Sequence, residues 1–434
     1  MNIAIFTLGC KVNQFETAAM ERELIARGHT LVPFDGPADA YIVNTCSVTA
    51  VSDKKSRNTI RRAKKLSPHA VIAVCGCYSQ TAPEEVAALE VDLVSGSAER
   101  MAFLDLLEEK LRLRQEEAAR ETTVSVDEPF KRRLFEPLIA GGMEGRTRAF
   151  LKVEDGCVNF CSYCIIPYSR GPIRSLPLEE ALAQAKAMAE EGYREIVLTG
   201  IEISSWGHDL KNGMGPADLI EAICLALPDL RIRLGSLEPR TVTEEFCRRV
   251  SVLPNLCPHF HLSLQSGCDA TLKRMNRKYD TARYYESVRL LRVFFQNPAI
   301  TTDLIVGFPQ ETEEEFTQTL DFIRKCAFSS MHIFPYSRRP GTPAAAMPGQ
   351  IQKAEQESRA HRAAQVAEEM ERAYLEQFVG CTVPVLFEEE KDGLWRGHAP
   401  NYLPVRAKGE DLHNVLRDVT VTGTDGSALL ATLL

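Results

Sequence analysis

Three cysteines stand close together in the stretch VEDGCVNFCSYCIIPYSRGPIRS. Cys157, Cys161 and Cys164 follow the spacing C-x3-C-x2-C. Thiolates bind zinc and iron–sulfur clusters, and both kinds of site commonly take four protein ligands. Because no fourth cysteine lies near these three in the sequence, a four-iron cluster held here would keep one iron open, and an open iron can bind a substrate. The alternative is a zinc site that a distant His or Cys completes.

A second set of cysteines is dispersed, but its members share a position relative to predicted strands. Cys10, Cys46 and Cys77 follow the apolar runs NIAIFTLG, DAYIVNT and AVIAVCG. The carboxyl ends of the strands in an open α/β sheet line one crevice, where ligands bind. We therefore predict that these cysteines converge, although three buried core cysteines would give the same pattern. Cys75 competes with Cys77, and we choose Cys77 because it follows Gly76 at the exit of the strand.

The elements that must position these cysteines fall into three predicted regions of an α/β protein. Residues 1–125 alternate short apolar runs with helix-forming stretches, which predicts a doubly wound parallel sheet. A linker follows over 126–144. Residues 145–372 repeat strand–helix units, which predicts a full or partial (β/α) barrel with the cysteine triplet at its C-terminal mouth. Residues 373–434 contain short β runs punctuated by Gly, Pro, Asn and Asp, and predict a small β-barrel.

Composition and charge are those of an ordinary globular protein. The chain has 434 residues, of which 44% are hydrophobic and 25% charged, and its length predicts two or three domains. No apolar run is long enough to span a membrane, and the start MNIAIFTLGC has no basic segment typical of a signal peptide. With thirteen cysteines and no export signal, we expect metal or redox chemistry in a cytoplasmic protein. The net charge of -8 argues against indiscriminate nucleic-acid coating but allows a local basic patch.

The triplet, with an aromatic residue before its last cysteine, resembles the radical S-adenosylmethionine superfamily. The resemblance implies that the triplet holds a [4Fe-4S] cluster whose open iron chelates S-adenosylmethionine, and that Tyr163 lies against the adenine. Reduction of the cluster then yields a 5′-deoxyadenosyl radical. The segments LTGIE, LSLQSG and DLIVGFPQET follow in the order expected for contacts with the methionyl amino group, the ribose and the adenine. The residues that they implicate are Gly200, Glu202, Ser263, Gln265, Ile305 and Gly307.

The first region resembles a narrower family, the methylthiotransferases. The motifs GCKVNQFETAAM, NTCSVTAVSDKKSR and GCYSQ resemble the N-terminal domain of that family, and HLSLQSGCDATLKRMNRKY and FPYSRRPGTPAAAMPGQ resemble its barrel. The C-terminal β-barrel resembles its RNA-binding TRAM module. The family implies that Cys10, Cys46 and Cys77 hold a second, auxiliary [4Fe-4S] cluster, which carries the sulfur or methylthio group. It also implies two partners, an external one-electron donor and a sulfur source.

Three branches of this family differ in substrate, and the residues around Cys10 separate them. TLGCKVNQFET resembles the branch that acts on N6-threonylcarbamoyladenosine at tRNA position 37, which implies the tRNA anticodon stem-loop as partner. The isopentenyladenosine branch typically shows Gln-Met between Cys and Asn, and the ribosomal-protein branch shows Pro-Lys. These sibling branches are alternatives, as is a non-catalytic RNA-binding iron–sulfur protein, against which the cofactor segments argue.

RNA binding requires cations, and two parts of the chain are candidates. From residue 373 onward there are five Lys and Arg against nine Asp and Glu, so the C-terminal barrel would rely on shape and stacking. Trp395 and Tyr402 are candidates for stacking, or they fill the barrel core. The run KKSRNTIRRAKK follows Cys46 on a predicted helix and is expected to contact the tRNA backbone, with a solvated helix face as the alternative. Its candidate residues are Lys54, Lys55, Arg57, Arg61, Arg62 and Lys65.

Overall fold

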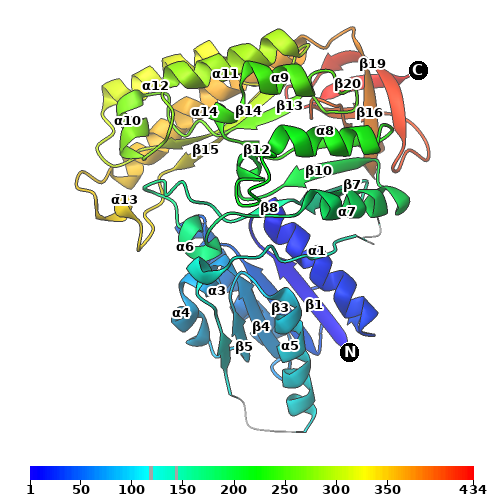
Figure 1. The fold of residues 1–434 in the computed structure, drawn as a ribbon, viewed down its shortest axis with the longest axis vertical. Coiled ribbons are helices and arrows are strands. Elements are labelled where there is room, and N and C mark those ends of the chain that lie inside the picture. The colour runs from blue at the N-terminus through cyan, green and yellow to red at the C-terminus, as the bar shows by residue number, and fades with distance from the viewer. Residues whose placement is uncertain (117–120, 142–144) are drawn as a thin grey trace. The chain divides into compact units, whose positions relative to one another are not determined.

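The structure, a computed structural model, describes residues 1–116, 121–141 and 145–434. Contacts within the chain divide it into two compact units (Figure 1). The first unit consists of Met1–Met143, Lys152–Leu176 and Arg338–Ala345. The second unit consists of Glu144–Leu151, Pro177–Ser337 and Ala346–Leu434. Part of the linker predicted over 126–144, namely 142–144, lies outside the described residues.

The first unit is built on a six-stranded sheet in the order β2-β1-β3-β4-β5-β6, and all neighbouring strands are parallel. Its strands are β1 (Asn2–Thr7), β2 (Thr30–Leu31), β3 (Ala40–Thr45), β4 (Val71–Gly76), β5 (Leu93–Ser95) and β6 (Thr123–Ser125). Its longer helices are α1 (Lys11–Ala26), α2 (Ala50–Leu66) and α5 (Arg100–Gln115), and its short helices include α3 (Cys77–Thr81) and α4 (Pro83–Ala87). The predicted parallel α/β sheet is confirmed.

Helices cover both faces of this sheet because successive strand residues point to opposite sides. Ile3 packs in a core cluster with Met20 of α1 and Phe103 of α5. The next residue, Ala4, belongs to a second cluster that includes Ile60 of α2. Each face of the sheet is therefore buried under its own set of helices, which explains why the strands are almost wholly apolar.

The rest of the first unit is a loop that carries the cysteine triplet. The two-residue strands β8 (Glu154–Asp155) and β9 (Arg174–Ser175) pair antiparallel and close its base. The short helix α6 (Ile166–Arg170) ends the loop and packs against α3 and against the 3-10 turn Pro129–Lys131.

The second unit contains the strand–helix repeats. Its strands form two sheet segments, in the orders β11-β10-β7 and β12-β13-β14-β15. The strands are β7 (Arg148–Lys152), β10 (Glu195–Thr199), β11 (Arg231–Leu234), β12 (Ser236–Leu237), β13 (His259–Leu262), β14 (Ala299–Val306) and β15 (Ser330–Pro335). The longer helices are α7 (Leu178–Glu190), α8 (Pro216–Ala226), α11 (Thr281–Phe294), α12 (Glu313–Cys326) and α14 (Lys353–Glu376), with short helices α9 (Glu244–Val250) and α10 (Asp269–Arg274). The short helix α13 (Pro343–Ala346) belongs to the first unit except for its last residue. The predicted partial (β/α) barrel is confirmed.

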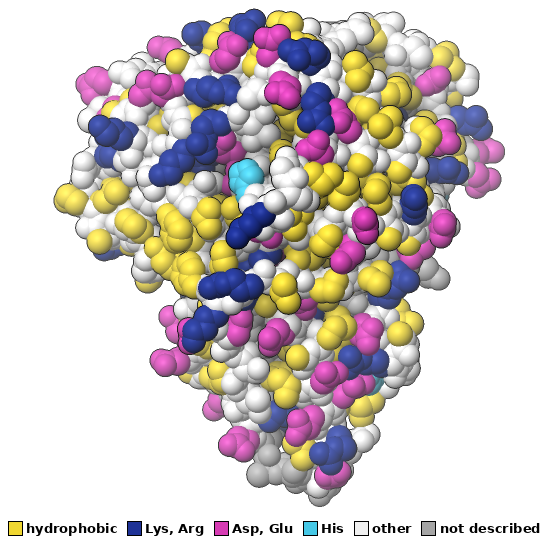
Figure 2. Space-filling model, in the orientation of Figure 1, with side chains coloured by type: hydrophobic (Ala, Val, Ile, Leu, Met, Phe, Trp, Pro, Cys, Tyr) yellow, Lys and Arg dark blue, Asp and Glu magenta, His cyan; other side chains and the backbone are white. Residues whose placement is uncertain are grey.

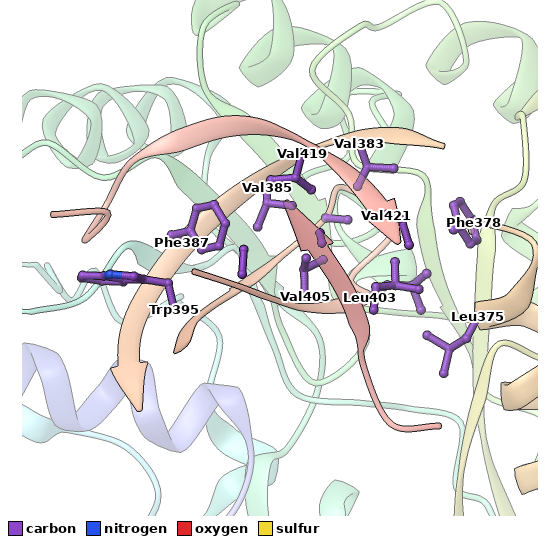
Figure 3. Close-up of a cluster of buried hydrophobic side chains, with 14 of the residues drawn as sticks. Leu375, Phe378, Val383, Val385, Phe387, Trp395, Leu403, Val405, Val419 and Val421 are labelled. Carbon is purple, nitrogen blue, oxygen red and sulfur yellow. The ribbon is translucent and has the colours of Figure 1, made fainter. Parts of the chain in front are cut away.

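The second unit also contains a closed barrel in the strand order β16-β17-β18-β20-β19. Its strands are β16 (Thr382–Lys391), β17 (Leu394–His398), β18 (Pro404–Ala407), β19 (Leu416–Thr424) and β20 (Leu429–Leu433). Figure 3 shows its core, in which Val385, Phe387 and Val419 gather between the strands, with Leu375 and Phe378 at the end of α14 beside them. The predicted small C-terminal β-barrel is confirmed. No helix in the described part of the chain is long and apolar enough to cross a membrane.

Candidate metal centres

The three cysteines of the dispersed set lie where three adjacent strands end. Cys10 follows β1 and caps α1, Cys46 follows β3, and Cys77 follows β4 and begins α3. The strand order reverses between β1 and β3, and open α/β sheets bind ligands outside the strand ends at such a point. Burial raises the pKa of Cys46 to about 11, and the neighbouring Cys77 and Cys10 thiols add to this rise. The structure therefore brings the three side chains of this set into one electrostatic environment.

Two glycines allow these strand ends to approach one another. Gly76 has a φ of +105°, and a Cβ placed on it would lie 2.4 Å from the carbonyl oxygen of Thr45. Gly9 has a φ of +111°, and its Cβ would lie 2.9 Å from the Cβ of Cys46. Both the backbone conformation and the close contact require glycine. The Gly before Cys10 and the Gly before Cys77 thus have a structural reason.

The structure also separates the two cysteines that compete at the end of β4. Cys75 is fully buried and belongs to the core cluster under α1 and α5, together with Met20 and Leu104. Burial raises its pKa to about 11. A thiol inside the apolar core is a packing residue, so this placement favours Cys77 as the ligand.

A buried asparagine connects the dispersed set to the loop of the triplet. The Oδ1 atom of Asn13 lies 3.9 Å from the Sγ of Cys10 and accepts a hydrogen bond from Nη2 of Arg170 at 2.7 Å. The Nδ2 atom of Asn13 donates to the backbone carbonyls of Leu8 at 2.8 Å and Thr45 at 3.0 Å. One side chain therefore fixes the ends of β1 and β3 and the end of α6 relative to one another.

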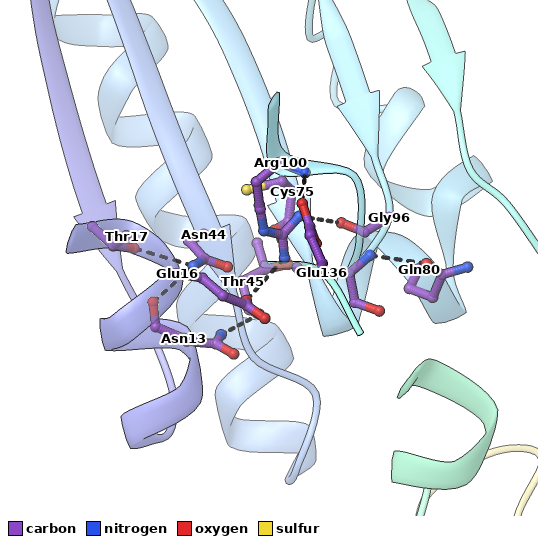
Figure 4. A network of polar contacts seen from close by, with 12 residues as sticks. Asn13, Glu16, Thr17, Asn44, Thr45, Cys75, Gln80, Gly96, Arg100 and Glu136 are labelled. Atoms are coloured by element: carbon purple, nitrogen blue, oxygen red, sulfur yellow. Dashed lines mark hydrogen bonds and ion pairs between the residues drawn. The ribbon is translucent and has the colours of Figure 1, made fainter. Parts of the chain in front are cut away.

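Two buried carboxylates, Glu16 and Asp155, continue this network. Figure 4 shows the first of them, Glu16, near Asn13 and Arg100. Glu16 accepts from Nη2 of Arg100 at 3.0 Å, from Nζ of Lys152 at 3.1 Å and from Nη2 of Arg170 at 3.2 Å. Asp155 lies 2.9 Å from Lys152 and 3.3 Å from Arg170, and it also pairs with Arg174. Burial alone would raise the pKa of Glu16, but its three cations lower it to about 2.

The loop of the triplet is held by its own backbone. The N–H of Cys157 donates to the carbonyl of Gly171 at 3.0 Å, and the N–H of Cys164 donates to the carbonyl of Cys161 at 2.9 Å. Gly171 has a φ of +78°, and a Cβ there would lie 2.1 Å from the carbonyl oxygen of Pro129. The loop therefore turns in a space that only glycine allows. Like the dispersed set, the triplet belongs to the first unit.

A segment that follows β15 attaches to the surroundings of both sets. Arg339 forms an ion pair with Asp53 and donates to the Oγ of Ser47 at 2.5 Å, directly after Cys46. The N–H of Ala344 donates to the carbonyl of Ser162, inside the triplet loop, at 2.8 Å. Two residues of the motif FPYSRRPGTPAAAMPGQ therefore attach this segment to the surroundings of the cysteine sets, a structural role that the sequence alone did not indicate.

The six residues implicated in cofactor binding besides Tyr163 lie at the carboxyl ends of barrel strands in the second unit. Gly200 and Glu202 follow β10, and Ser263 follows β13. Gln265 has a φ of +69° and exchanges backbone hydrogen bonds with β14, donating to Asp303 and accepting from Ile305 at 2.9 Å each. Gly307 follows β14. Tyr163 belongs to the first unit.

The candidate RNA-binding residues differ in exposure. Lys54, Lys55, Arg61, Arg62 and Lys65 are exposed on α2, whereas Arg57 is half-buried and donates to the hydroxyl of Tyr78 at 2.9 Å. Arg62 forms an ion pair with Asp35. On the face shown in Figure 2, Lys and Arg side chains are interspersed with Asp and Glu side chains rather than gathered in one basic patch.

The two candidate aromatics of the C-terminal barrel are engaged within the second unit. Trp395 is only 9% exposed and belongs to the core cluster of Figure 3, which favours a packing role over base stacking. The ring of Tyr402 stacks on His398 with centroids 4.6 Å apart, and the guanidinium of Arg233 lies 4.6 Å from its centroid. Tyr402 remains 37% exposed, so only part of its surface is open to a base.

The donor atoms and their surroundings fit an iron–sulfur cluster. In the described part of the chain, no three His, Cys, Asp or Glu side chains meet at a position where they could hold one metal ion. A four-iron cluster binds each thiolate at a different iron, so its ligands need not meet at one point. The buried Nε of Arg170 has no hydrogen-bond partner among the described residues, although buried donors normally have one. A sulfur-rich anionic group beside Cys10 and Cys77 would suit this donor.

Comparisons with known proteins identify families and relatives of this chain. The family model of the radical SAM superfamily matches residues 151–323, and that of the uncharacterized protein family UPF0004 matches residues 2–96. The chain is 38% identical over 416 residues to "Threonylcarbamoyladenosine tRNA methylthiotransferase MtaB" of Bacillus subtilis (strain 168), covering 94% of this chain and 91% of that protein. It is 39% identical to the protein of the same name from Thermotoga maritima, covering 89% of this chain and 86% of the relative.

Two further matches bear on the substrate and on the fold. The "tRNA-2-methylthio-N(6)-dimethylallyladenosine synthase" of Oleidesulfovibrio alaskensis is 38% identical, covering 88% of this chain and 82% of that protein. Among solved structures, the radical S-adenosylmethionine methyltransferase TsrM from Kitasatospora setae matches with a TM-score of 0.58 at 15% identity, covering 91% of this chain and 80% of that chain. At this identity the structural match supports the fold.

Proposed function

We propose that this chain, which belongs to the radical S-adenosylmethionine methylthiotransferase family, converts N6-threonylcarbamoyladenosine in tRNA to its 2-methylthio derivative. The observation that carries the proposal is the gathering of two cysteine sets in one unit, at the ends of β1, β3 and β4 and in the loop closed by β8 and β9. The chain is a tRNA methylthiotransferase. It uses two [4Fe-4S] clusters and S-adenosylmethionine.

The residues divide between the two clusters according to these sets. Cys157, Cys161 and Cys164 would hold the radical-generating cluster, and Cys10, Cys46 and Cys77 would hold the auxiliary one. When bound, these groups and S-adenosylmethionine supply a primary carbon radical, which can take a hydrogen atom from an unreactive aromatic C–H, and the sulfur that replaces it. The protein holds and orients them and excludes water, which is the usual division of labour with cofactors.

S-adenosylmethionine would be bound by the residues that the family resemblance implicates. Tyr163 would lie against the adenine, while Gly200 and Glu202 would contact the methionyl amino group. The ribose would be reached by Ser263 and Gln265, and the adenine would also be supported by Ile305 and Gly307. The positions of the last six residues support these roles. Two of them follow β10, two follow β13, and two lie within or just after β14. Barrel enzymes keep their chemistry at these carboxyl ends of their strands.

The choice of the substrate branch rests on the first motif and on the relatives. Five relatives named for threonylcarbamoyladenosine are 33–39% identical to the chain and cover 89% or more of it. Three named for dimethylallyladenosine are 32–38% identical. Because these ranges overlap, Lys11 and Val12 after Cys10 carry the distinction. The tRNA anticodon stem-loop, a one-electron donor and a sulfur source would be the partners, in the cytoplasm.

Mass spectrometry of digested tRNA tests the substrate. Deleting the gene should remove the methylthio group from N6-threonylcarbamoyladenosine and leave the threonylcarbamoyl group in place. Loss of the isopentenyl-type product instead would move the protein to the sibling branch, and intact tRNA with a changed ribosomal protein would move it to the third. Anaerobic incubation of the reconstituted protein with reductant and S-adenosylmethionine should yield 5′-deoxyadenosine, which a mere electron carrier would not form.

A further inference from the structure

Arg170 stands between the two cysteine sets. It ends α6, which follows the triplet in sequence, and its side chain is fully buried. Its Nη2 atom donates to Asn13 at 2.7 Å, and Asn13 in turn contacts the Sγ of Cys10. α6 also packs against α3, which begins at Cys77. Arg170 is therefore close in sequence to the triplet, and it is connected to the dispersed set by contacts of its side chain and its helix.

The charge of Arg170 is only partly neutralised by its carboxylate partners. Glu16 is shared with Arg100 and Lys152, and Asp155 is shared with Lys152 and Arg174. Each of these carboxylates thus contacts three cationic side chains. A guanidinium that shares both of its partners retains positive potential toward other neighbours, and charges interact strongly in a buried environment.

The cysteines of the dispersed set are the neighbours on which the positive potential of Arg170 acts. The Oδ1 atom of Asn13 that accepts from Nη2 of Arg170 lies 3.9 Å from the Sγ of Cys10, so a single atom separates the guanidinium from this thiol. Cys77 begins α3, the helix against which α6 packs.

We propose that Arg170 is a positioning residue whose charge stabilises negative charge at the Cys10, Cys46 and Cys77 site and thereby raises the reduction potential of the cluster held there. The proposal rests on the proposed function, which assigns a cluster to these cysteines. The reduction potentials of iron–sulfur clusters depend on net charge, hydrogen bonds to sulfur and solvent exposure. Reduction adds a negative charge, so a buried cation nearby favours the reduced form.

A purely structural ion pair is the competing explanation, because removing one partner of a buried pair is strongly destabilising whatever its function. The two explanations differ in sign. If charge is what matters, removing the cation and removing its carboxylate partner must shift the potential in opposite directions. If the pair only supports the fold, both changes loosen the same site and no such opposition is expected.

The test uses the full chain with Cys157, Cys161 and Cys164 replaced by Ala, so that only the auxiliary cluster remains. Its midpoint potential is measured by dithionite titration followed by electron paramagnetic resonance. Arg170→Met should lower the potential and Glu16→Gln should raise it, while Arg170→Lys, which keeps the charge, should stay close to the parent. Arg233→Met is the matched control, because Arg233 is equally buried and paired, with Glu195, in the second unit.

The outcomes separate this proposal from the proposed function. If the parent with the triplet removed binds no iron, the assignment of a cluster to Cys10, Cys46 and Cys77 is wrong. If it binds iron but Arg170→Met and Glu16→Gln leave the potential unchanged, or shift it in the same direction, the role of Arg170 is wrong. Should Arg170→Met fail to fold, the rise in Glu16→Gln against an unchanged Arg170→Lys decides the matter.

Discussion

The side chain of Asn13 joins three segments of the first unit, and its loss should be felt at all of them. Asn13→Ala leaves the carbonyls of Leu8 and Thr45 and the guanidinium of Arg170 without this partner. Leaving buried polar groups unsatisfied costs about 1–3 kcal/mol. We expect the cluster-free variant to unfold at a lower temperature in calorimetry, whereas Asn58→Ala, an exposed change on α2, should stay within about 0.5 kcal/mol of the parent. Equal transitions for the two variants would contradict this role.

The cysteines themselves predict an iron content. Two four-iron clusters bring the reconstituted protein to about eight irons per chain. Replacing Cys157, Cys161 and Cys164 by Ala should reduce this to about four, because the dispersed set is intact. Cys75→Ala is the control at the second site and should retain all the iron, since Cys75 lies in the apolar core. Loss of all iron in the triple variant, or zinc in place of iron, would refute two separate clusters.

The exposed cations of α2 lead to a prediction at the scale of an element. If this helix lies along the anticodon stem, its Lys and Arg side chains neutralise phosphates, and each contact makes binding more sensitive to salt. Replacing Arg61, Arg62 and Lys65 by Glu should weaken tRNA binding and flatten its salt dependence. Substrate tRNAs should suffer alike, because phosphate contacts carry no sequence information. The measurement is the dissociation constant at several salt concentrations.

The control for this helix changes the same amount of charge elsewhere. Three exposed cations of the second unit can be replaced by Glu as this control, namely Arg248, Arg289 and Lys353. This triple variant should bind tRNA with the affinity and the salt dependence of the parent. If the α2 variant binds tRNA normally, the C-terminal barrel becomes the candidate for RNA binding instead of α2. There Tyr402 would be the residue to test, since Trp395 is buried.

The elements were predictable from sequence because local patterns determine them, whereas the contacts between distant residues were not. The apolar runs before Cys10, Cys46 and Cys77 predicted β1, β3 and β4 and the convergence at their ends. Nothing local indicates that Asn13 meets Arg170, which lies 157 residues away. Both stand inside the quoted motifs, GCKVNQFETAAM and the stretch around the triplet, but their types alone named no partner.

At the scale of the whole molecule, the sequence and the contacts divide the chain differently. The strand–helix pattern assigned the triplet to the barrel region over 145–372. The contacts group its loop, Lys152–Leu176, with the first unit instead. The reason is the buried network, in which Lys152, Asp155 and Arg170 of this loop bind Glu16 or Asn13 of α1, or pair with one another. Ion pairing across 136 and 154 residues leaves no periodic pattern in a sequence.

Two clusters in one chain predict that the two halves of the reaction can be separated. Replacing Cys10, Cys46 and Cys77 by Ala leaves the triplet and its loop backbone in place, so the variant should still cleave S-adenosylmethionine reductively to 5′-deoxyadenosine. It should place no methylthio group on tRNA, because the proposed assignment puts the sulfur-carrying cluster on these three cysteines. Chromatography of the nucleoside product and mass spectrometry of the tRNA measure the two halves in one incubation. The variant without the triplet is the reciprocal control and should do neither. Methylthiolation by the Cys10, Cys46 and Cys77 variant at the rate of the parent would show that the sulfur comes from elsewhere.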